Sequence, residues 1–149
     1  MSNRAMTTER ILGEFQDLVA GSVLTNERIA DSLGVSSVDW QAFSVIARAP
    51  RPLTAGELST LTRLPTSTTT RVIDRLEHHG FIERAPEATD RRRVVVLPKQ
   101  EILTRFTSDG DDNPYSVIKG IVRKVHEKFT TEELQVVERY LRALNADFQ

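Results

Sequence analysis

The chain has 149 residues, of which 39% are apolar and 28% are charged, and its formal net charge at pH 7 is −1. This length suits one compact domain, or one small module flanked by further helices. No apolar run approaches the roughly 18 residues of a membrane span, and the polar segment after Met1 has no cleavage-site pattern. We therefore expect a cytoplasmic protein with no membrane partner.

The sequence contains no cysteine and only three histidines. Disulfides and sensing by thiol oxidation are excluded, because no thiolate is present. His78 and His79 are adjacent, whereas two metal ligands on one helical face stand three or four residues apart. We interpret these two histidines as the surface of a helix end, and we expect neither a metal site nor a cofactor.

The N-terminal segment has the pattern of an amphipathic helix. Between residues 8 and 24 apolar side chains recur every three or four positions and form one stripe to bury. This stripe consists of Ile11, Leu12, Phe15, Leu18 and Val19. Gly21 and Ser22 are predicted to weaken the end of the helix, and a second helical pattern around residues 29–33 is stopped by Gly34.

The next helix is predicted to begin at Ser36. Ser36 and Asp39 have the spacing of a capping box at its start. The apolar residues of this helix are Trp40, Phe43 and Ile46, and Pro50 and Pro52 end it. The proline-rich residues 49–53 predict a hinge-like connector.

Residues 54–79 have the pattern of two short helices separated by a tight turn. Thr54 and Glu57 form a capping box for the first helix, which is expected to bury Leu58 and Leu61. The second helix is expected to face the core with Thr69, Val72, Ile73 and Leu76, which recur at helical spacing.

The start and the opposite face of this second helix are almost entirely hydrogen-bonding. They carry Thr66, Ser67, Thr68, Thr70, Arg71, Asp74 and Arg75. Hydroxyls at a helix N-terminus suit phosphate oxygens and base edges, and arginines reach further along a groove. The alternative interpretation is that the Ser and Thr side chains are caps and solvated surface. The set as a whole favours duplex DNA.

A two-stranded hairpin is predicted directly after this helix. Residues 81–85 and 92–97 have strand composition, and residues 86–91 have turn chemistry. The far end of the hairpin carries Asp90, Arg91, Arg92 and Arg93. Such a charge run is commonly solvated surface, but beside a hydroxyl-rich helix we interpret it as a wing tip that enters the minor groove.

The charges are distributed unevenly along the chain. Residues 62–99 contain eight Lys or Arg against five Asp or Glu, although the whole chain is slightly acidic. A basic excess at the predicted helix and hairpin favours a nucleic-acid partner, because distribution matters more than the sum.

Two helices and a hairpin in this order define a winged helix-turn-helix. Over the middle third, the runs Glu57-Leu58, Leu64-Pro65-Thr66-Ser67, 70–77, 80–84 and Asp90-Arg91-Arg92 resemble the multiple-antibiotic-resistance regulator (MarR) family of bacterial transcription factors. The resemblance implies that residues 66–79 form the recognition helix, that Arg92 enters the minor groove, and that Asp90 helps to hold the wing tip in shape.

Two features depart from the family pattern. Arg63 occupies a turn position that is often Gly, so a left-handed conformation there would cost about 1 kcal/mol, or the turn differs. After the wing, Pro98 and the Asp/Gly/Asn/Pro cluster at residues 108–114 replace a smooth passage into the next helix. The cluster lacks the Gly position and the closing Glu of a calcium loop, so we interpret it as an exposed turn.

The C-terminal third is predicted to be helical. Ile102, Leu103 and Phe106 indicate a short helix, and residues 115–129 form another, which places Ile118, Val122 and Val125 inward. Thr130 and Glu133 predict a capping box for the last helix. Its stripe is Leu134, Val137, Leu141, Leu144 and Phe148. This stripe packs either on the preceding helix of a monomer or on a second subunit, and the resemblance favours the homodimer.

We therefore predict a mainly helical fold with three parts. Residues 1–50 form a dimerisation helix and a connecting helix, residues 51–98 the winged helix-turn-helix module, and residues 99–149 the C-terminal dimerisation helices. The predicted function is a ligand-responsive repressor that binds a pseudo-palindromic operator in double-stranded DNA as a homodimer. The alternative is a winged-helix interaction module without DNA binding. We expect no enzyme, because no catalytic constellation is present.

The resemblance also implies a small aromatic or phenolic effector, lodged where the dimerisation helices meet the DNA module. Phe15, Trp40 and Phe43 are the candidate ligand-binding residues. The competing interpretation is that these aromatic side chains are plain core.

Overall fold

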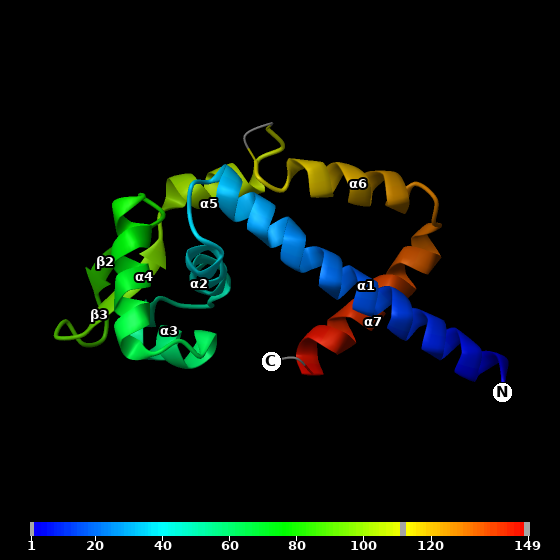
Figure 1. Cartoon of the computed structure of the whole chain (residues 1–149), viewed down its shortest axis with the longest axis horizontal. Coiled ribbons are helices and arrows are strands. Elements are labelled where there is room, and N and C mark those ends of the chain that lie inside the picture. The colour runs from blue at the N-terminus through cyan, green and yellow to red at the C-terminus, as the bar shows by residue number, and fades with distance from the viewer. Residues whose placement is uncertain (1, 111–112, 148–149) are drawn as a thin grey trace. The chain divides into compact units, whose positions relative to one another are not determined.

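The computed structural model describes residues 2–110 and 113–147 (Figure 1). The helices are α1 (Asn3–Ser32), α2 (Ser37–Arg48), α3 (Ala55–Thr62), α4 (Thr66–His78), α5 (Gln100–Thr107), α6 (Ser116–His126) and α7 (Thr131–Asp147). The strands are β1 (Leu53–Thr54), β2 (Ile82–Pro86) and β3 (Val94–Pro98). This confirms the mainly helical winged helix-turn-helix fold. The chain divides into two compact units, Met1–Ser108 and Asp109–Gln149.

α1 is one continuous helix, so the predicted break near Gly21 and Ser22 is wrong. Gly inside a helix costs only about 1 kcal/mol relative to Ala, which the neighbouring turns can offset. The Ser22 hydroxyl donates to the carbonyl of Val19 at 2.7 Å and is satisfied within the helix. The helix ends at Ser32 with Leu33 as its C-cap, and Gly34 follows with a left-handed φ of 69°.

Aromatic rings fill the core of the first unit. Trp40 and Phe43 on α2 are 2% and 1% exposed. The Phe43 ring lies 5.2 Å from that of Phe81. The ring of Phe106 on α5 lies 5.4 Å from that of Trp40 and 5.5 Å from that of Phe43. This packing favours the core interpretation of Trp40 and Phe43, while Phe15 is half-buried on α1.

The two helices of the helix-turn-helix begin and pack largely as expected. The capping box of α3 is confirmed: the Thr54 hydroxyl accepts from the Glu57 amide, and the Glu57 carboxylate accepts from the Thr54 amide. Leu58 is fully buried, but Leu61 is 58% exposed, so its predicted burial is wrong. On α4 the buried residues are Thr69, Val72, Ile73 and Leu76, as predicted.

The hairpin belongs to a three-stranded antiparallel sheet in the order β1-β3-β2. The predicted connector at residues 49–53 contributes the edge strand, because Leu53 pairs with Val96. β3 starts at Val94, two residues later than predicted. The backbone of Arg93 donates to the Asp90 carbonyl and accepts from the Glu87 amide, both at 2.9 Å, so residues 87–93 form the turn.

The second unit contains α6 and α7. The predicted capping box at the start of α7 is confirmed, because the Thr130 amide donates to Glu133 Oε2 at 2.8 Å and the Glu133 amide donates to the Thr130 hydroxyl at 3.2 Å. α6 ends at His126, before the predicted residue 129.

Apolar side chains on α1, α6 and α7 are open to solvent in the single chain. They include Ile11, Leu12, Leu18 and Val19 on α1, Val122 and Val125 on α6, and Val137 and Leu141 on α7. The last residue of the predicted C-terminal stripe, Phe148, lies outside the described residues. No helix among the described residues is both long and apolar enough to cross a membrane.

Candidate nucleic-acid interface

The N-terminal end of α4 and the tip of the β2–β3 hairpin lie at the same end of the first unit (Figure 1). β2 runs back along α4, because Arg84 Nη2 on β2 lies 2.5 Å from Asp74 Oδ1 and the same guanidinium bonds Glu77. From these contacts, eight helical residues lead back roughly 12 Å to Thr66. β2 continues from Arg84 to Pro86, and the turn of residues 87–93 follows it. The start of α4 and the tip therefore share one surface, which we call the α4–wing face.

Most of the predicted contact residues are exposed on the α4–wing face. The exposed ones are Thr66, Ser67, Thr70, Arg71, Arg75, Asp90, Arg91, Arg92 and Arg93, and Thr68 is half-buried. The Thr70 hydroxyl donates to the Thr66 carbonyl at 3.1 Å. That bond leaves the lone pairs of the Thr70 oxygen available as acceptors.

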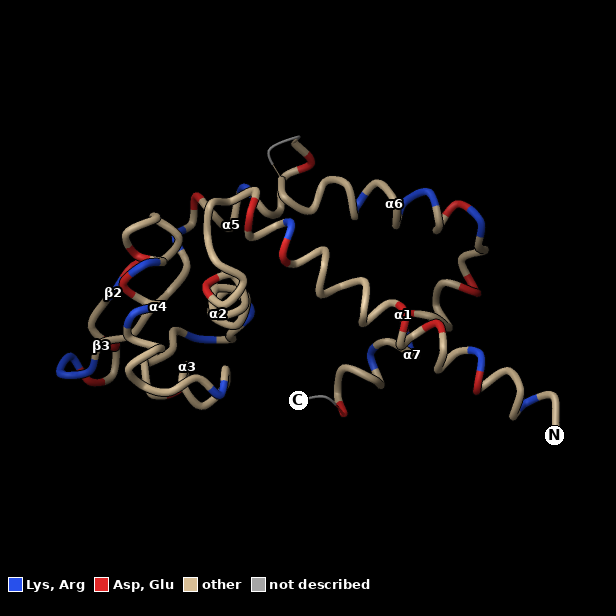
Figure 2. The backbone as a smooth tube through the Cα atoms, viewed as in Figure 1, with Lys and Arg blue, Asp and Glu red and all other residues tan. Residues whose placement is uncertain are grey.

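Three arginines of this face are free to meet an anion. Across residues 2–110 and 113–147, Arg71, Arg91 and Arg92 form no ion pair and no side-chain hydrogen bond. Figure 2 shows the basic wing tip in blue beyond the end of the sheet. Three unpaired guanidinium groups on one side create a positive potential that attracts phosphate.

Two other predicted DNA contacts, Arg75 and Arg93, are already bonded within the protein. Arg75 Nη2 lies 2.6 Å from Asp39 Oδ1, and Arg75 Nε donates to Asp39 Oδ2 at 2.9 Å. Arg93 Nη1 lies 3.1 Å from Glu87 Oε2 at the base of the hairpin. The structure therefore gives both side chains a structural partner, and their contact with DNA stays a prediction.

The bond between Arg75 and Asp39 joins α4 to α2. The Asp39 side chain is 4% exposed, whereas that of Arg75 is 46% exposed. Burial raises the pKa of Asp39, but hydrogen bonds from Arg75 and Ser36 and the charge of Arg75 outweigh burial, and the pKa is lowered overall. Asp39 thus stays ionised and fixes the middle of α4.

Asp90 shapes the wing tip as the resemblance implied. One carboxylate oxygen accepts from the Arg92 amide at 3.0 Å, in an Asx-type turn. This bond uses the backbone of Arg92 and leaves its guanidinium free. Asp90 is therefore placed as a structural residue of the tip.

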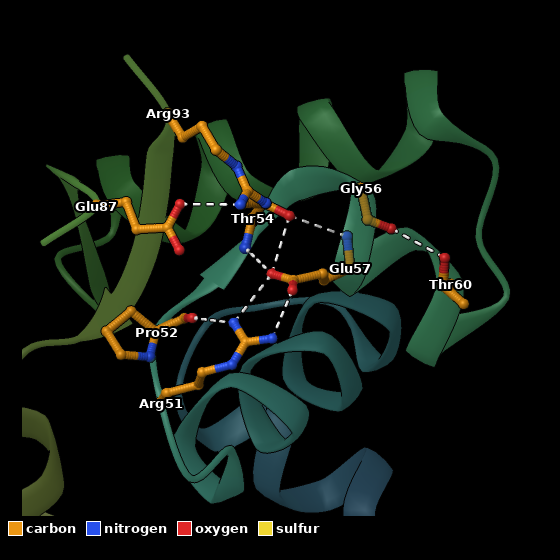
Figure 3. A network of polar contacts seen from close by, with 8 residues as sticks. All are labelled: Arg51, Pro52, Thr54, Gly56, Glu57, Thr60, Glu87 and Arg93. Atoms are coloured by element: carbon orange, nitrogen blue, oxygen red, sulfur yellow. Dashed lines mark hydrogen bonds and ion pairs between the residues drawn. The ribbon is translucent and has the colours of Figure 1, made fainter. Parts of the chain in front are cut away.

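A network of ion pairs and hydrogen bonds between side chains lies at the base of the wing (Figure 3). Arg51 Nη2 donates to Glu57 Oε1 at 2.6 Å, and the hydrogen bonds from Arg51 and then from Thr54 lower the pKa of Glu57 to about 2. The pKa of Arg51 is raised, first by its hydrogen bond with Glu57 and the charge of that residue, and then by the charge of Glu87. Since Glu87 pairs with Arg93, the network connects the start of α3 with the wing.

The sequence did not show that Asp39 and Glu87 pair with two of the predicted DNA-contact arginines. Asp39 was interpreted only as part of a helix cap, and its partner Arg75 lies 36 positions later. No periodic signal relates positions so far apart in sequence.

The His79 Nδ1–H donates to the Arg75 carbonyl at 2.8 Å, which agrees with the interpretation of His79 as part of the helix end. Among the described residues no group of His, Cys, Asp and Glu is arranged to hold a metal ion.

The fold and the α4–wing face define a winged helix-turn-helix protein. Residues 33–93 match the model of the MarR family. The resemblance seen in the sequence is thereby confirmed.

Two curated relatives come from Bacillus subtilis (strain 168). The HTH-type transcriptional regulator YcgE is 38% identical over 84 residues, which cover 56% of this chain and 54% of that protein. The HTH-type transcriptional regulator YsmB is 32% identical over 104 residues, which cover 65% and 63%. The match thus spans about half to three-fifths of the length of these relatives. Both relatives are named as HTH-type transcriptional regulators.

Solved structures share the fold over nearly the whole chain. The transcriptional regulator Tm0710 from Thermotoga maritima is 22% identical, with a TM-score of 0.63 over 95% of this chain and 93% of that one. A mutant of MepR from S. aureus, bound to an oligodeoxyribonucleotide, is 13% identical, with a TM-score of 0.58 over 93% and 98%. At these identities the likeness supports the fold.

Proposed function

We propose that this protein is a DNA-binding transcriptional regulator that acts as a homodimer on a pseudo-palindromic operator. The observation that carries the proposal is that Arg71, Arg91 and Arg92, which have no ion pair among the described residues, lie on the same face as the hydroxyl-rich start of α4. Hydroxyls and Arg71 suit the major groove, whereas a protruding arginine tip suits the minor groove. The solved MepR complex with an oligodeoxyribonucleotide supports the same use of this fold.

A homodimer is supported by the open apolar stripes of α1, α6 and α7. Soluble monomers rarely leave large contiguous apolar patches exposed, and heptad-like stripes pair with other helices. Two copies related by a two-fold axis would place two α4 helices about one turn of DNA apart. Sedimentation velocity at micromolar concentration should therefore give twice the chain mass, and a monomer would contradict the proposal.

Arg92→Ala is expected to weaken binding to a selected duplex by at least about 1 kcal/mol, on the scale of a single groove contact. The reason is that Arg92 is exposed at the tip while Asp90 holds its backbone. Fluorescence anisotropy at fixed salt measures the loss. Arg28→Ala, which removes an exposed arginine from α1, is the matched control and should bind as the wild type does. Equal affinities of all three proteins would remove Arg92 from the interface.

We further propose that the protein is a repressor released by a small aromatic or phenolic molecule. The proposal rests on the family and on the aromatic residues Phe15, Trp40 and Phe43, of which the last two are also core. A thermal-shift screen with substituted phenols should find a compound that both stabilises the protein and releases DNA. A screen that finds no such compound would remove this part of the proposal.

An interaction module without DNA binding is the competing function. It predicts that no duplex is retained even at low salt, where electrostatic binding is strongest. DNA binding instead predicts retention at low salt and a steep loss of affinity as salt rises. Selection of bound sites from genomic fragments should then recover an inverted repeat.

A further inference from the structure

Arg63, in the turn between α3 and α4, has an unusual backbone conformation. Its φ of 56° and ψ of 24° are left-handed, and among the described residues it is the sole non-glycine with positive φ. The other two left-handed positions are Gly34 and Gly80. The chain therefore uses glycine in two of these turns and arginine in the third, where a side chain is sterically unfavourable.

The part of the chain that the structure describes gives the Arg63 side chain no partner. Its side chain is exposed, and across residues 2–110 and 113–147 it forms no ion pair and no side-chain hydrogen bond. Its backbone amide donates to the Thr60 carbonyl at 3.4 Å, a bond that any residue except proline would make. Glycine at position 63 would therefore make the fold at least as stable as arginine does.

The turn holds Arg63 beside the α4–wing face. The Ser59 hydroxyl donates to the Leu64 carbonyl at 2.6 Å, which fixes the residue that follows Arg63. Pro65 is the N-cap of α4, so Arg63 precedes Thr66 by three residues. Three Cα–Cα steps of about 3.8 Å place the Arg63 backbone within roughly 11 Å of Thr66, and the long side chain extends the reach.

We infer that Arg63 binds a phosphate of the DNA backbone next to the bases that α4 contacts. This inference rests on the proposed DNA binding and adds a contact that the sequence did not predict. A guanidinium in a turn outside the groove meets phosphate oxygens, which fix position and raise affinity on every sequence. Arg63 thus contributes affinity and register, whereas the selectivity lies in α4.

The test is Arg63→Gly, which removes the side chain and suits the left-handed backbone. The melting temperature is expected to stay unchanged or to rise. Affinity should fall several-fold, by the same factor on a duplex selected by the wild type and on an unrelated duplex of equal length. The slope of log affinity against log salt should decrease by about 1 for each protomer, because one phosphate contact is lost.

Two more variants separate charge from backbone. Arg63→Asn removes the charge but tolerates the left-handed conformation, so it should bind as weakly as Arg63→Gly does. Arg63→Lys retains the charge and should keep most of the salt slope. Arg28→Ala controls for net charge and should leave both affinity and slope unchanged.

The inference fails if Arg63→Gly binds both duplexes with the affinity and salt slope of the wild type. It also fails if the loss is confined to the selected duplex, since that would make Arg63 a base-reading residue. A wild-type protein that retains no duplex at low salt would overturn the proposed function and this contact together. Wild-type binding with an unaffected Arg63→Gly would overturn the contact alone.

Discussion

Leu58→Ala is expected to lower the free energy of unfolding by about 3 kcal/mol, within the range for fully buried leucines. Leu58 is 0% exposed on α3, a helix that packs on both α2 and α4. Truncation therefore leaves a cavity at the centre of the helix-turn-helix. Denaturant unfolding measures the effect as a shift of the midpoint at constant slope.

Leu61→Ala is the matched control for this experiment. It makes the same substitution three residues later on the same helix, where the side chain is 58% exposed. Little surface is recovered from water there, so the change should stay below about 0.5 kcal/mol. Equal losses for the two variants would contradict the assignment of Leu58, and not Leu61, to the core.

The difference in burial between Leu58 and Leu61 illustrates which features of the fold could be predicted from the sequence. Helix starts were predictable because a cap depends on residues three positions apart, as with Thr54 and Glu57. The buried face of α4 was predictable because four residues share one face over a 13-residue helix. α3 has only eight residues, so its two leucines fit a stripe without showing which neighbour covers each of them.

The tertiary partners of the site could not be predicted. The strand β1 has only two residues, and it forms by pairing with β3. Two residues are too few for a local sequence pattern to predict a strand. The charges of Arg75 and Arg93 were visible in the sequence, but their pairing with Asp39 and Glu87 was not. The sequence therefore proposed five arginines for DNA, and the structure leaves Arg71, Arg91 and Arg92 unpaired among its described residues.

Arg75→Ala is expected to destabilise the protein by about 2 kcal/mol. The variant leaves a buried carboxylate without its main partner, which costs about 3 to 5 kcal/mol in a fully buried pair. The smaller value applies here because Arg75 is half-exposed and Ser36 still bonds Asp39. Arg71→Ala, one turn earlier and unpaired, should change stability by less than about 0.5 kcal/mol. Similar losses of stability in both variants would show that the bond between Arg75 and Asp39 does not stabilise the protein.

The pH dependence of the Arg75→Ala effect identifies its cause. In the wild type the pKa of Asp39 lies below its usual value of 3.8, so the ion pair contributes stability above that pH and loses it as pH falls further. In Arg75→Ala the bonds from the guanidinium are gone while burial remains, so the pKa of Asp39 should rise. The stability difference between the two proteins should therefore be full at neutral pH. It should shrink as pH falls through the pKa of Asp39 in the variant towards the lowered pKa of the wild type. A difference that is constant from pH 3 to pH 7 would assign the loss to packing of the arginine stem on α2, and not to the buried charge.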